Sequence, residues 1–102
     1  MSRTSLHEEL CTLLGSRHVY FQPPPTVSMH YPCFVYDLRL IGTRKADDDI
    51  YQMNDSYTVK YITRDPDSTM PHDILRNWRY VAFDRVYKAD NLYHYVYTLY
   101  HN

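Results

Sequence analysis

The chain has 102 residues, which is enough for one compact domain (1–102) and too few for a second core. A formal net charge of -1 excludes a general electrostatic attraction to nucleic acid or to acidic membranes. Two glycines argue against a phosphate-binding loop, whereas twelve tyrosines favour sheets and protein–protein contacts.

The first predicted element is an N-terminal helix that begins near Ser5 and ends at Gly15. Ser5 and Glu8 have the spacing of a capping box, and glycine ends a helix at little conformational cost. Between them an apolar stripe recurs at helical spacing: Leu6, Leu10, Cys11, Leu13 and Leu14. Because no basic patch precedes a long apolar run, we expect no signal peptide, no membrane span, and an intracellular, reduced chain.

A proline-rich element follows the short run Val19–Phe21. Three consecutive prolines in Gln22–Pro25 cannot continue a helix and remove three backbone donors, so this stretch is expected to be extended and rigid. It is either a simple connector or an arm in which Gln22, Pro23 and Pro24 contact a neighbouring subunit.

Four strands are predicted from apolar and alternating runs, at about 32–41, 55–63, 80–87 and 91–100. A short helix from about Pro71 to Trp78, capped by Ser68 or Asp67, separates the second strand from the third. Its inward-facing residues are expected to be Ile74, Leu75 and Trp78. The short turns favour antiparallel pairing. The predicted class is therefore α+β, an antiparallel sheet of about four strands with both helices on one face.

A charged loop of mixed sign lies between the first two strands. Its adjacent aspartates lack the alternating ligands and the distal glutamate of a calcium loop, so we expect no metal there. The loop is either solvated or lines a channel or faces a neighbouring ring, with these candidate residues: Arg44, Lys45, Asp47, Asp48 and Asp49.

Little in the sequence indicates catalysis. The six histidines are scattered without the spacing of a zinc site, and His94, near Asp90, is expected to have a hydrogen-bonding role. Cys11 and Cys33 are expected to be small buried hydrophobes, with a disulfide between them left open. No nucleophile elbow or glycine-rich loop occurs, so we expect no enzyme and no cofactor.

The last predicted strand has two faces that are both partly apolar. One face holds Tyr93, Tyr95, Tyr97 and Leu99, and residues at the intervening positions form the other. A strand of this kind is covered on one side by its own domain and on the other by a further element or a neighbouring subunit. Candidate anchors between subunits are therefore Tyr95, Tyr97 and Tyr100, with packing beneath the N-terminal helix as the alternative.

Three segments resemble a family of small tailed-bacteriophage proteins encoded among head–tail joining and tail genes: YFQPPPTVSMHYPCFVY, YTVKYITRDPDSTMP and FDRVYKADNLYHYVYTLY. The most specific parts are the turn Arg64–Ser68 and the hairpin Ala89–His94, and the resemblance covers nearly the whole chain. It departs at Tyr93 and Tyr95, where more polar residues are expected.

The resemblance implies a structural virion protein of the neck, most similar to tail terminators or tail-completion proteins. Such proteins form homohexameric rings that cap the tail tube and join it to the head-side connector. The implied partners are other copies of the chain, the tail tube protein and the head–tail connector or stopper protein. Genomic DNA would only pass through the lumen, no membrane is involved, and assembly occurs in the host cytoplasm before the protein resides in the virion.

Three alternatives stay open at this stage. A head-completion connector or stopper ring differs from a tail terminator only in placement. A small nucleic-acid-binding accessory protein would use sheet aromatics, but Arg85 and Lys88 are matched by Asp84 and Asp90, so phosphate binding would be weak. A small hydrolase using His94 or Asp90 is the remote option.

Overall fold

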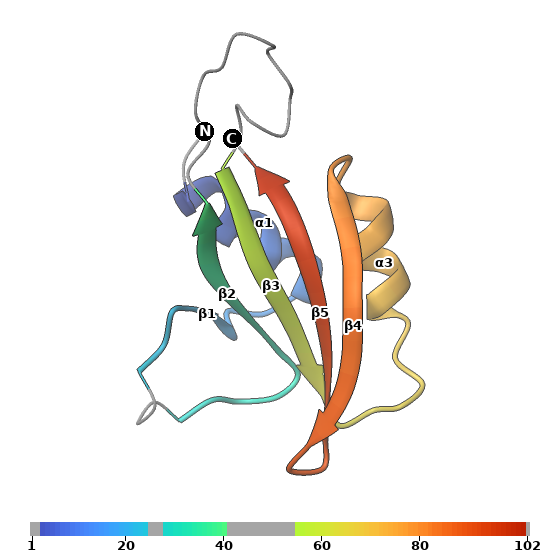
Figure 1. Ribbon diagram of the computed structural model, residues 1–102. Helices are drawn as coiled ribbons and strands as arrows, with labels where there is room; N and C mark the ends of the chain where they lie inside the picture. The colour runs from blue at the N-terminus through green and yellow to red at the C-terminus, as the bar shows by residue number, and fades with distance from the viewer. Residues whose placement is uncertain (1–2, 25–27, 41–54, 102) are drawn as a thin grey trace, which may run out of the picture.

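The computed structural model describes residues 3–24, 28–40 and 55–101. In chain order the elements are α1 (Arg3–Leu14), β1 (Val19–Phe21), β2 (Cys33–Leu40), β3 (Asp55–Thr63), α3 (Met70–Asn77), β4 (Val81–Ala89) and β5 (Leu92–His101). The strands form one sheet in the order β1-β2-β3-β5-β4, and both helices lie behind it in Figure 1. The predicted α+β class with helices on one face is confirmed.

The sheet is mixed and has five strands, a small correction to the predicted antiparallel sheet of about four. β1 runs parallel to β2, with Val19 opposite Phe34 and Phe21 opposite Tyr36, whereas all other pairs are antiparallel. A three-residue run carries too little periodicity to predict a strand. Its partner is also reached through a long connection rather than a hairpin.

Helix α1 starts earlier than the sequence predicts. Arg3 is already helical, so the capping box at Ser5 is wrong; the Ser5 hydroxyl donates instead to Glu9 Oε2 at 3.5 Å, one turn on. The predicted end is confirmed, because Gly15 has a φ of +80° and its N–H donates to the Cys11 carbonyl at 2.9 Å.

Helix α3 agrees with its prediction to within one residue at each end. Thr69 occupies the N-cap position without a side-chain cap, and the Ser68 hydroxyl accepts a hydrogen bond from the Met70 N–H at 3.2 Å. Ile74 is buried as expected, but Leu75 is 42% exposed. The inward prediction fails for Leu75 because α3 lies beside the edge strand β4, where the sheet ends.

The main core lies between the helices and the sheet. The fully buried side chains there include Leu6, Leu10, Phe34, Tyr36, Ile74, Tyr97 and Leu99. A smaller cluster of Cys33, Ile62 and Leu92 lies apart from it. Cys11 and Cys33 belong to different clusters and both are free thiols, so they are buried hydrophobes as predicted and form no disulfide.

The last two strands form the predicted hairpin. Asp90 and Asn91 have φ values of 54° and 62°, the left-handed pair that a two-residue turn of this kind requires. β5 consequently lies between β3 and β4 rather than at an edge. No helix in the described part of the chain is long and apolar enough to cross a membrane.

Candidate functional site

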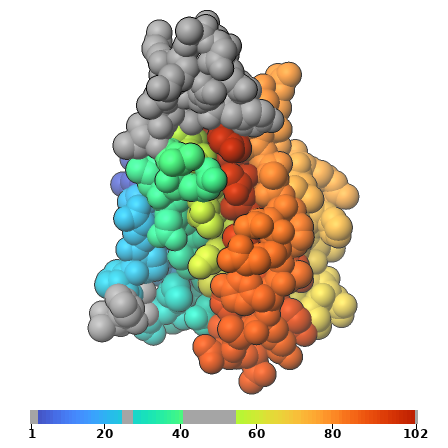
Figure 2. Space-filling view, in the orientation of Figure 1, coloured from blue at the N-terminus to red at the C-terminus, as the bar shows by residue number. Residues whose placement is uncertain are grey.

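Strand β4 is the most exposed strand of the described chain. Seven of its nine residues are exposed, and its outer side pairs with no described strand. Phe83, Val86 and Tyr87 are 46%, 48% and 37% exposed. In the space-filling view the orange residues of this segment form a continuous ridge along one side of the molecule (Figure 2). An edge that combines free backbone groups with apolar side chains favours pairing with another chain.

An apolar hollow opens between this edge and α3. It is lined by Pro71, His72, Leu75, Phe83, Tyr95 and Tyr97. The Phe83 ring lies edge-on to Tyr97, with centroids 5.4 Å apart, so the exposed ring continues the core outward. Leu75 and Phe83 are its exposed apolar members, and the hollow therefore presents an apolar surface to whatever contacts this edge.

The opposite edge of the sheet is incomplete in a different way. β1 covers β2 only from Phe34 to Tyr36. Beyond it, the Gln22 side chain accepts a hydrogen bond from the Leu38 N–H at 3.3 Å and partly replaces the missing strand. Leu38 and Leu40 are 39% and 58% exposed. This edge therefore also carries exposed apolar side chains that no other described residue covers.

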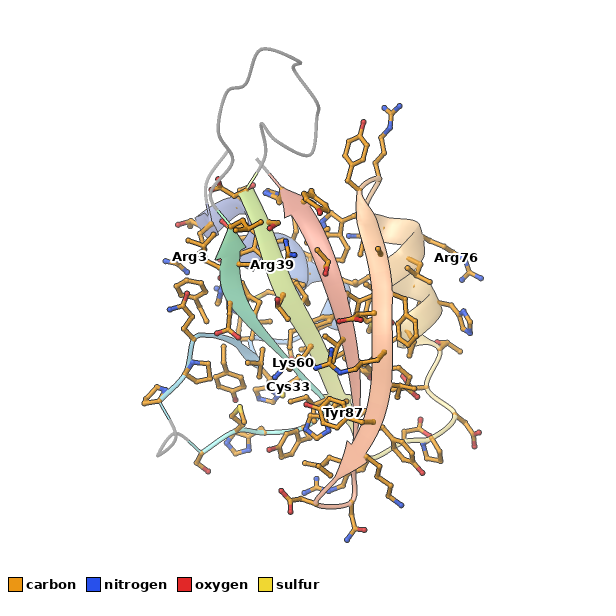
Figure 3. All side chains as sticks on the ribbon, in the orientation of Figure 1. Arg3, Cys33, Arg39, Lys60, Arg76 and Tyr87 are labelled. Atoms are coloured by element: carbon orange, nitrogen blue, oxygen red, sulfur yellow. The ribbon has the colours of Figure 1, made fainter. Side chains whose placement is uncertain are left out.

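The sheet face opposite the helices carries positive charge over a small apolar cluster. Lys60 and Arg64 alternate with buried Ile62 on this face, and the Arg39 guanidinium reaches the Ser56 hydroxyl there at 3.4 Å. Figure 3 labels Arg39 and Lys60 on the side of the sheet turned away from the helices. The Arg64 guanidinium lies 5.3 Å from the centroid of the Tyr31 ring.

Tyr87 and His94 form a stacked pair where β4 meets β5. Their rings are 4.7 Å apart and inclined by 7°. His94 Nδ1 is 3.1 Å from the Leu92 carbonyl oxygen, a hydrogen bond of the kind predicted for it. The stacked rings and this hydrogen bond both belong to the packing of the hairpin.

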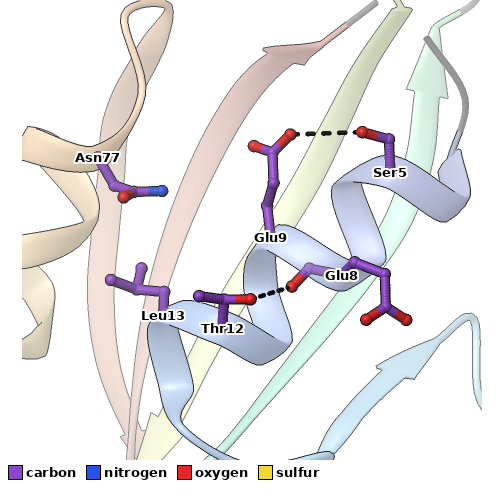
Figure 4. Close-up of a pocket in the computed structure, with 6 residues that line it drawn as sticks. All are labelled: Ser5, Glu8, Glu9, Thr12, Leu13 and Asn77. Carbon is purple, nitrogen blue, oxygen red and sulfur yellow. Dashed lines mark hydrogen bonds between the residues drawn. The ribbon is translucent and has the colours of Figure 1, made fainter.

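Glu9 joins the N-terminal helix to the other end of the chain. Its carboxylate accepts hydrogen bonds from the Trp78 indole N–H at 2.7 Å and from His101 Nε2 at 3.0 Å. The same carboxylate and Ser5 line a shallow surface pocket with Glu8, Thr12, Leu13 and Asn77 (Figure 4). Burial alone would raise the pKa of Glu9, but the hydrogen bonds from His101 and Trp78 lower it below its usual value.

The carboxylates of this acidic pocket hold parts of their own chain together. Glu8 is paired with Arg17 at 2.9 Å, which holds the pKa of Glu8 below its ordinary value. His101 Nδ1 is buried and has no hydrogen-bond partner within the described residues. Each carboxylate of the pocket is thus already engaged by the chain itself.

Other buried acids have raised pKa values because burial disfavours their charged forms. Burial raises the pKa of Tyr97 to about 12, and it raises the pKa of the Cys33 thiol to about 12. A buried thiol of this kind is a poor nucleophile. Among residues 3–24, 28–40 and 55–101, no three His, Cys, Asp or Glu side chains are grouped to hold a metal.

The structure separates the three tyrosines predicted as subunit anchors. Tyr97 is fully buried in its own chain and its hydroxyl donates to the Pro71 carbonyl at 2.9 Å, so it is a core residue and the interface prediction fails for it. Tyr95 and Tyr100 are half-buried, and their role between subunits stays a prediction. The Gln22 side chain is hydrogen-bonded to the Leu38 N–H of its own chain, and Pro23 and Pro24 lie outside the strands. Their contact with a neighbouring subunit stays a prediction.

The predicted channel or neighbouring-ring loop lies outside the described residues: Arg44, Lys45, Asp47, Asp48 and Asp49. Sequence reasoning missed the exposed apolar residues of the two edges. Their alternation looks the same in a central strand and in an edge strand, so no local signal marked Val86 or Leu40 as exposed. It also missed Glu9, whose partners lie 69 and 92 residues away in the chain.

Comparisons with known proteins found no matching family model, no matching curated protein and no matching solved structure.

Proposed function

We propose that this protein is a structural component of a tailed-bacteriophage virion, a homohexameric ring at the neck that caps the tail tube and joins the tail to the head-side connector. The observation that carries the proposal is the long edge strand β4, which leaves apolar side chains and free backbone groups open to a neighbour. A ring repeats such a contact around a symmetry axis, and each subunit then protects the edge of the next.

The segments that carry the phage resemblance support the proposal by their placement. The Arg64–Ser68 turn and the Ala89–His94 hairpin lie at the same end of the sheet, since Thr63 is opposite Tyr93. The first turn is fixed by the Asp65 carboxylate, which accepts a hydrogen bond from the Asp67 N–H at 2.9 Å. Two rigid turns at one end give a defined surface for an axial partner such as the tail tube or the connector.

The test is electron microscopy of particles from a phage that carries an early stop codon in this gene. We expect overlong tails, or unjoined tails beside DNA-filled heads, with normal particles restored by the gene supplied from a plasmid. Normal-length free tails beside emptied heads would instead assign the protein to the head-side connector or stopper ring. Normal infectious virions would contradict the structural role.

One observation favours a second candidate, a nucleic-acid-binding accessory protein. The helix-free face presents Arg39, Lys60 and Arg64, of which Arg64 lies beside the Tyr31 ring, and basic charge among aromatics is the pattern that binds single strands. Asp37 on β2 and the Asp84–Arg85 ion pair reduce this charge. Fluorescence anisotropy with labelled single-stranded DNA decides: no binding at low salt removes this candidate, and a salt-sensitive affinity would support it.

A further inference from the structure

The large apolar side chains that the described chain leaves exposed all lie at the two edges of its sheet. Leu38 and Leu40 are on β2 at one edge; Phe83, Val86 and Tyr87 on β4, with Leu75 of the adjoining helix α3, are at the other. The centre of the sheet is closed by comparison, because β3 and β5 pair on both sides. Within the described residues the sheet thus has two different edges that carry exposed apolar side chains.

The strand directions decide how two copies can meet along these edges. β2 is antiparallel to β3, β3 to β5, and β5 to β4, so β4 runs opposite to β2 within one chain. If a second copy is placed beside the first in the same orientation, β4 of one faces the β1–β2 edge of the other, and β4 runs antiparallel to β2. An antiparallel approach is the more stable geometry, so the edge strands of two copies can lie side by side without inverting a subunit.

We infer that copies of this chain associate head to tail, with the β4 edge of one copy against the Leu38–Leu40 edge of the next. The apolar residues of β4 and the hollow beside α3 receive Leu38 and Leu40 of the neighbour. A contact between two different surfaces is heterologous, and it closes into a ring when the rotation between copies permits. The inference deepens the proposed function by naming the ring contact, and it rests on that function for the closure of the ring.

The side-chain environment of the second edge fits this geometry. Gln22 Oε1 holds the Leu38 N–H, and Gln22 itself has a φ of 43°, which turns the chain away from β2 after only three paired residues. The end of β2 is therefore left free of β1 at Leu38 and Leu40. Because Gln22 already holds the Leu38 N–H, a neighbouring β4 strand meets this end of the sheet through the exposed Leu38 and Leu40 side chains, without displacing β1 or Gln22.

Two single-edge variants test the inference by mass measured with light scattering and native mass spectrometry. Val86→Glu blocks the β4 edge and Leu40→Glu blocks the β2 edge, because each places a charge in the proposed apolar contact. The unaltered protein is expected to form a closed oligomer, and each variant alone a monomer. An equimolar mixture of the two variants is expected to form a heterodimer that grows no further, since it contains one intact pair of edges.

Controls separate loss of contact from loss of folding. Thr12→Glu changes an exposed residue of α1 that belongs to neither edge strand, and is expected to keep the oligomer of the unaltered protein. Val86→Lys carries the opposite charge at the same site and must behave like Val86→Glu, and circular dichroism of each variant must match that of the unaltered protein.

Several outcomes overturn the inference. They are a monomeric unaltered protein at high concentration, a mixture that stays monomeric, or Leu40→Glu that assembles normally while Val86→Glu does not, which indicates a two-fold contact between β4 edges. Its failure is distinct from failure of the proposed function. Defective tails with a monomeric mixture would refute only this contact, whereas a heterodimer together with normal virions lacking the gene would refute only the phage role.

Discussion

Strands β3 and β4 have nine residues each and both pair with β5, yet they differ in burial along almost their whole length. Six of the nine residues of β3 are buried, whereas none of β4 is. Their compositions do not explain this, since both mix apolar, aromatic and charged side chains. Position in the sheet explains it: β3 is flanked by β2 and β5 beneath α1, and β4 ends the sheet. The comparison separates residues that hold the fold from residues available for assembly.

The largest expected effect on stability comes from truncating a leucine in the core between the helices and the sheet. Leu10→Ala removes a fully buried side chain of α1 that packs with the β3 side chains of the core, and should lower the free energy of unfolding by about 2–5 kcal/mol. Urea unfolding of the monomeric Val86→Glu background measures it without the contribution of assembly.

Leu75→Ala is the matched control, since it is the same substitution in a helix but on the β4 side, where the leucine is 42% exposed. We expect a loss below about 1 kcal/mol, because little burial is removed. Equal losses of unfolding free energy for Leu10→Ala and Leu75→Ala would contradict the difference in burial between the core and the β4 edge.

Tyr97→Phe tests the hydrogen bond that joins the sheet to α3. Removing the hydroxyl deletes its hydrogen bond to the Pro71 carbonyl, at a cost of about 1–2 kcal/mol in the free energy of unfolding. Tyr87→Phe on the exposed edge strand is the control, with a change below about 0.5 kcal/mol expected. A larger loss for Tyr87→Phe would show that the edge contributes to the folded monomer.

The same tyrosine predicts a dependence on alkaline pH. Its folded-state pKa of about 12 lies above the ordinary value of 10, so the unfolded chain releases its proton first. The stability contribution is complete below pH 10 and is lost as the pH rises from about 10 to about 12. Between pH 8 and pH 11 the free energy of unfolding should fall less steeply with pH for Tyr97→Phe than for the unaltered protein. An equal slope for the two proteins would contradict the burial of the Tyr97 hydroxyl.

Glu9→Gln tests the hydrogen bonds that join helix α1 to Trp78 and His101. The neutral amide cannot retain the charge-assisted bonds from Trp78 and His101. Because the Glu9 side chain is 40% exposed, we expect a loss of about 1 kcal/mol at neutral pH. Glu8→Gln, on the exposed side of the same helix, is the control and should change stability less than Glu9→Gln does, because the Glu8–Arg17 pair is solvent-exposed.

The lowered pKa of Glu9 also gives this prediction a pH signature. A lowered folded-state pKa stabilises the fold above the ordinary value of 4.5, and the contribution is lost as the pH falls below it. Thermal unfolding between pH 3 and pH 7 should therefore be less pH-dependent in Glu9→Gln than in the unaltered protein. An unchanged pH dependence would show that the hydrogen bonds to His101 and Trp78 do not form.

The smallest effect is expected at the hairpin that carries β4. Asn91 has a φ of 62°, where alanine is strained and glycine is not, so Asn91→Ala should cost about 0.5–1 kcal/mol. Asn91→Gly is expected to be neutral or slightly stabilising, since glycine is favoured at the second position of this turn. Equal losses for both, measured by thermal unfolding, would show that the Asn91 side chain acts rather than its backbone.

Local chemistry along the chain was enough to predict most of the fold. The period-two pattern at 55–63, the helical leucine stripe of α1, Gly15 as its end and the Asp90–Asn91 turn each depend on residues close together in sequence. The start of α1, the parallel strand β1 and the exposure of Leu75 were not predictable, because each depends on distant partners. The resemblance to phage neck proteins came from short segments, and its functional content stays a proposal.

The sequence alone therefore determined which of the longer segments are helices and strands and that Cys11 and Cys33 are buried. The tertiary structure alone decided which strand lies at the edge, that Tyr97 belongs to the core, and that Glu9 meets His101. Periodicity records which residues share a face of a strand, but burial depends on what packs against that face. Only the order β1-β2-β3-β5-β4 shows which faces and edges the chain covers by itself.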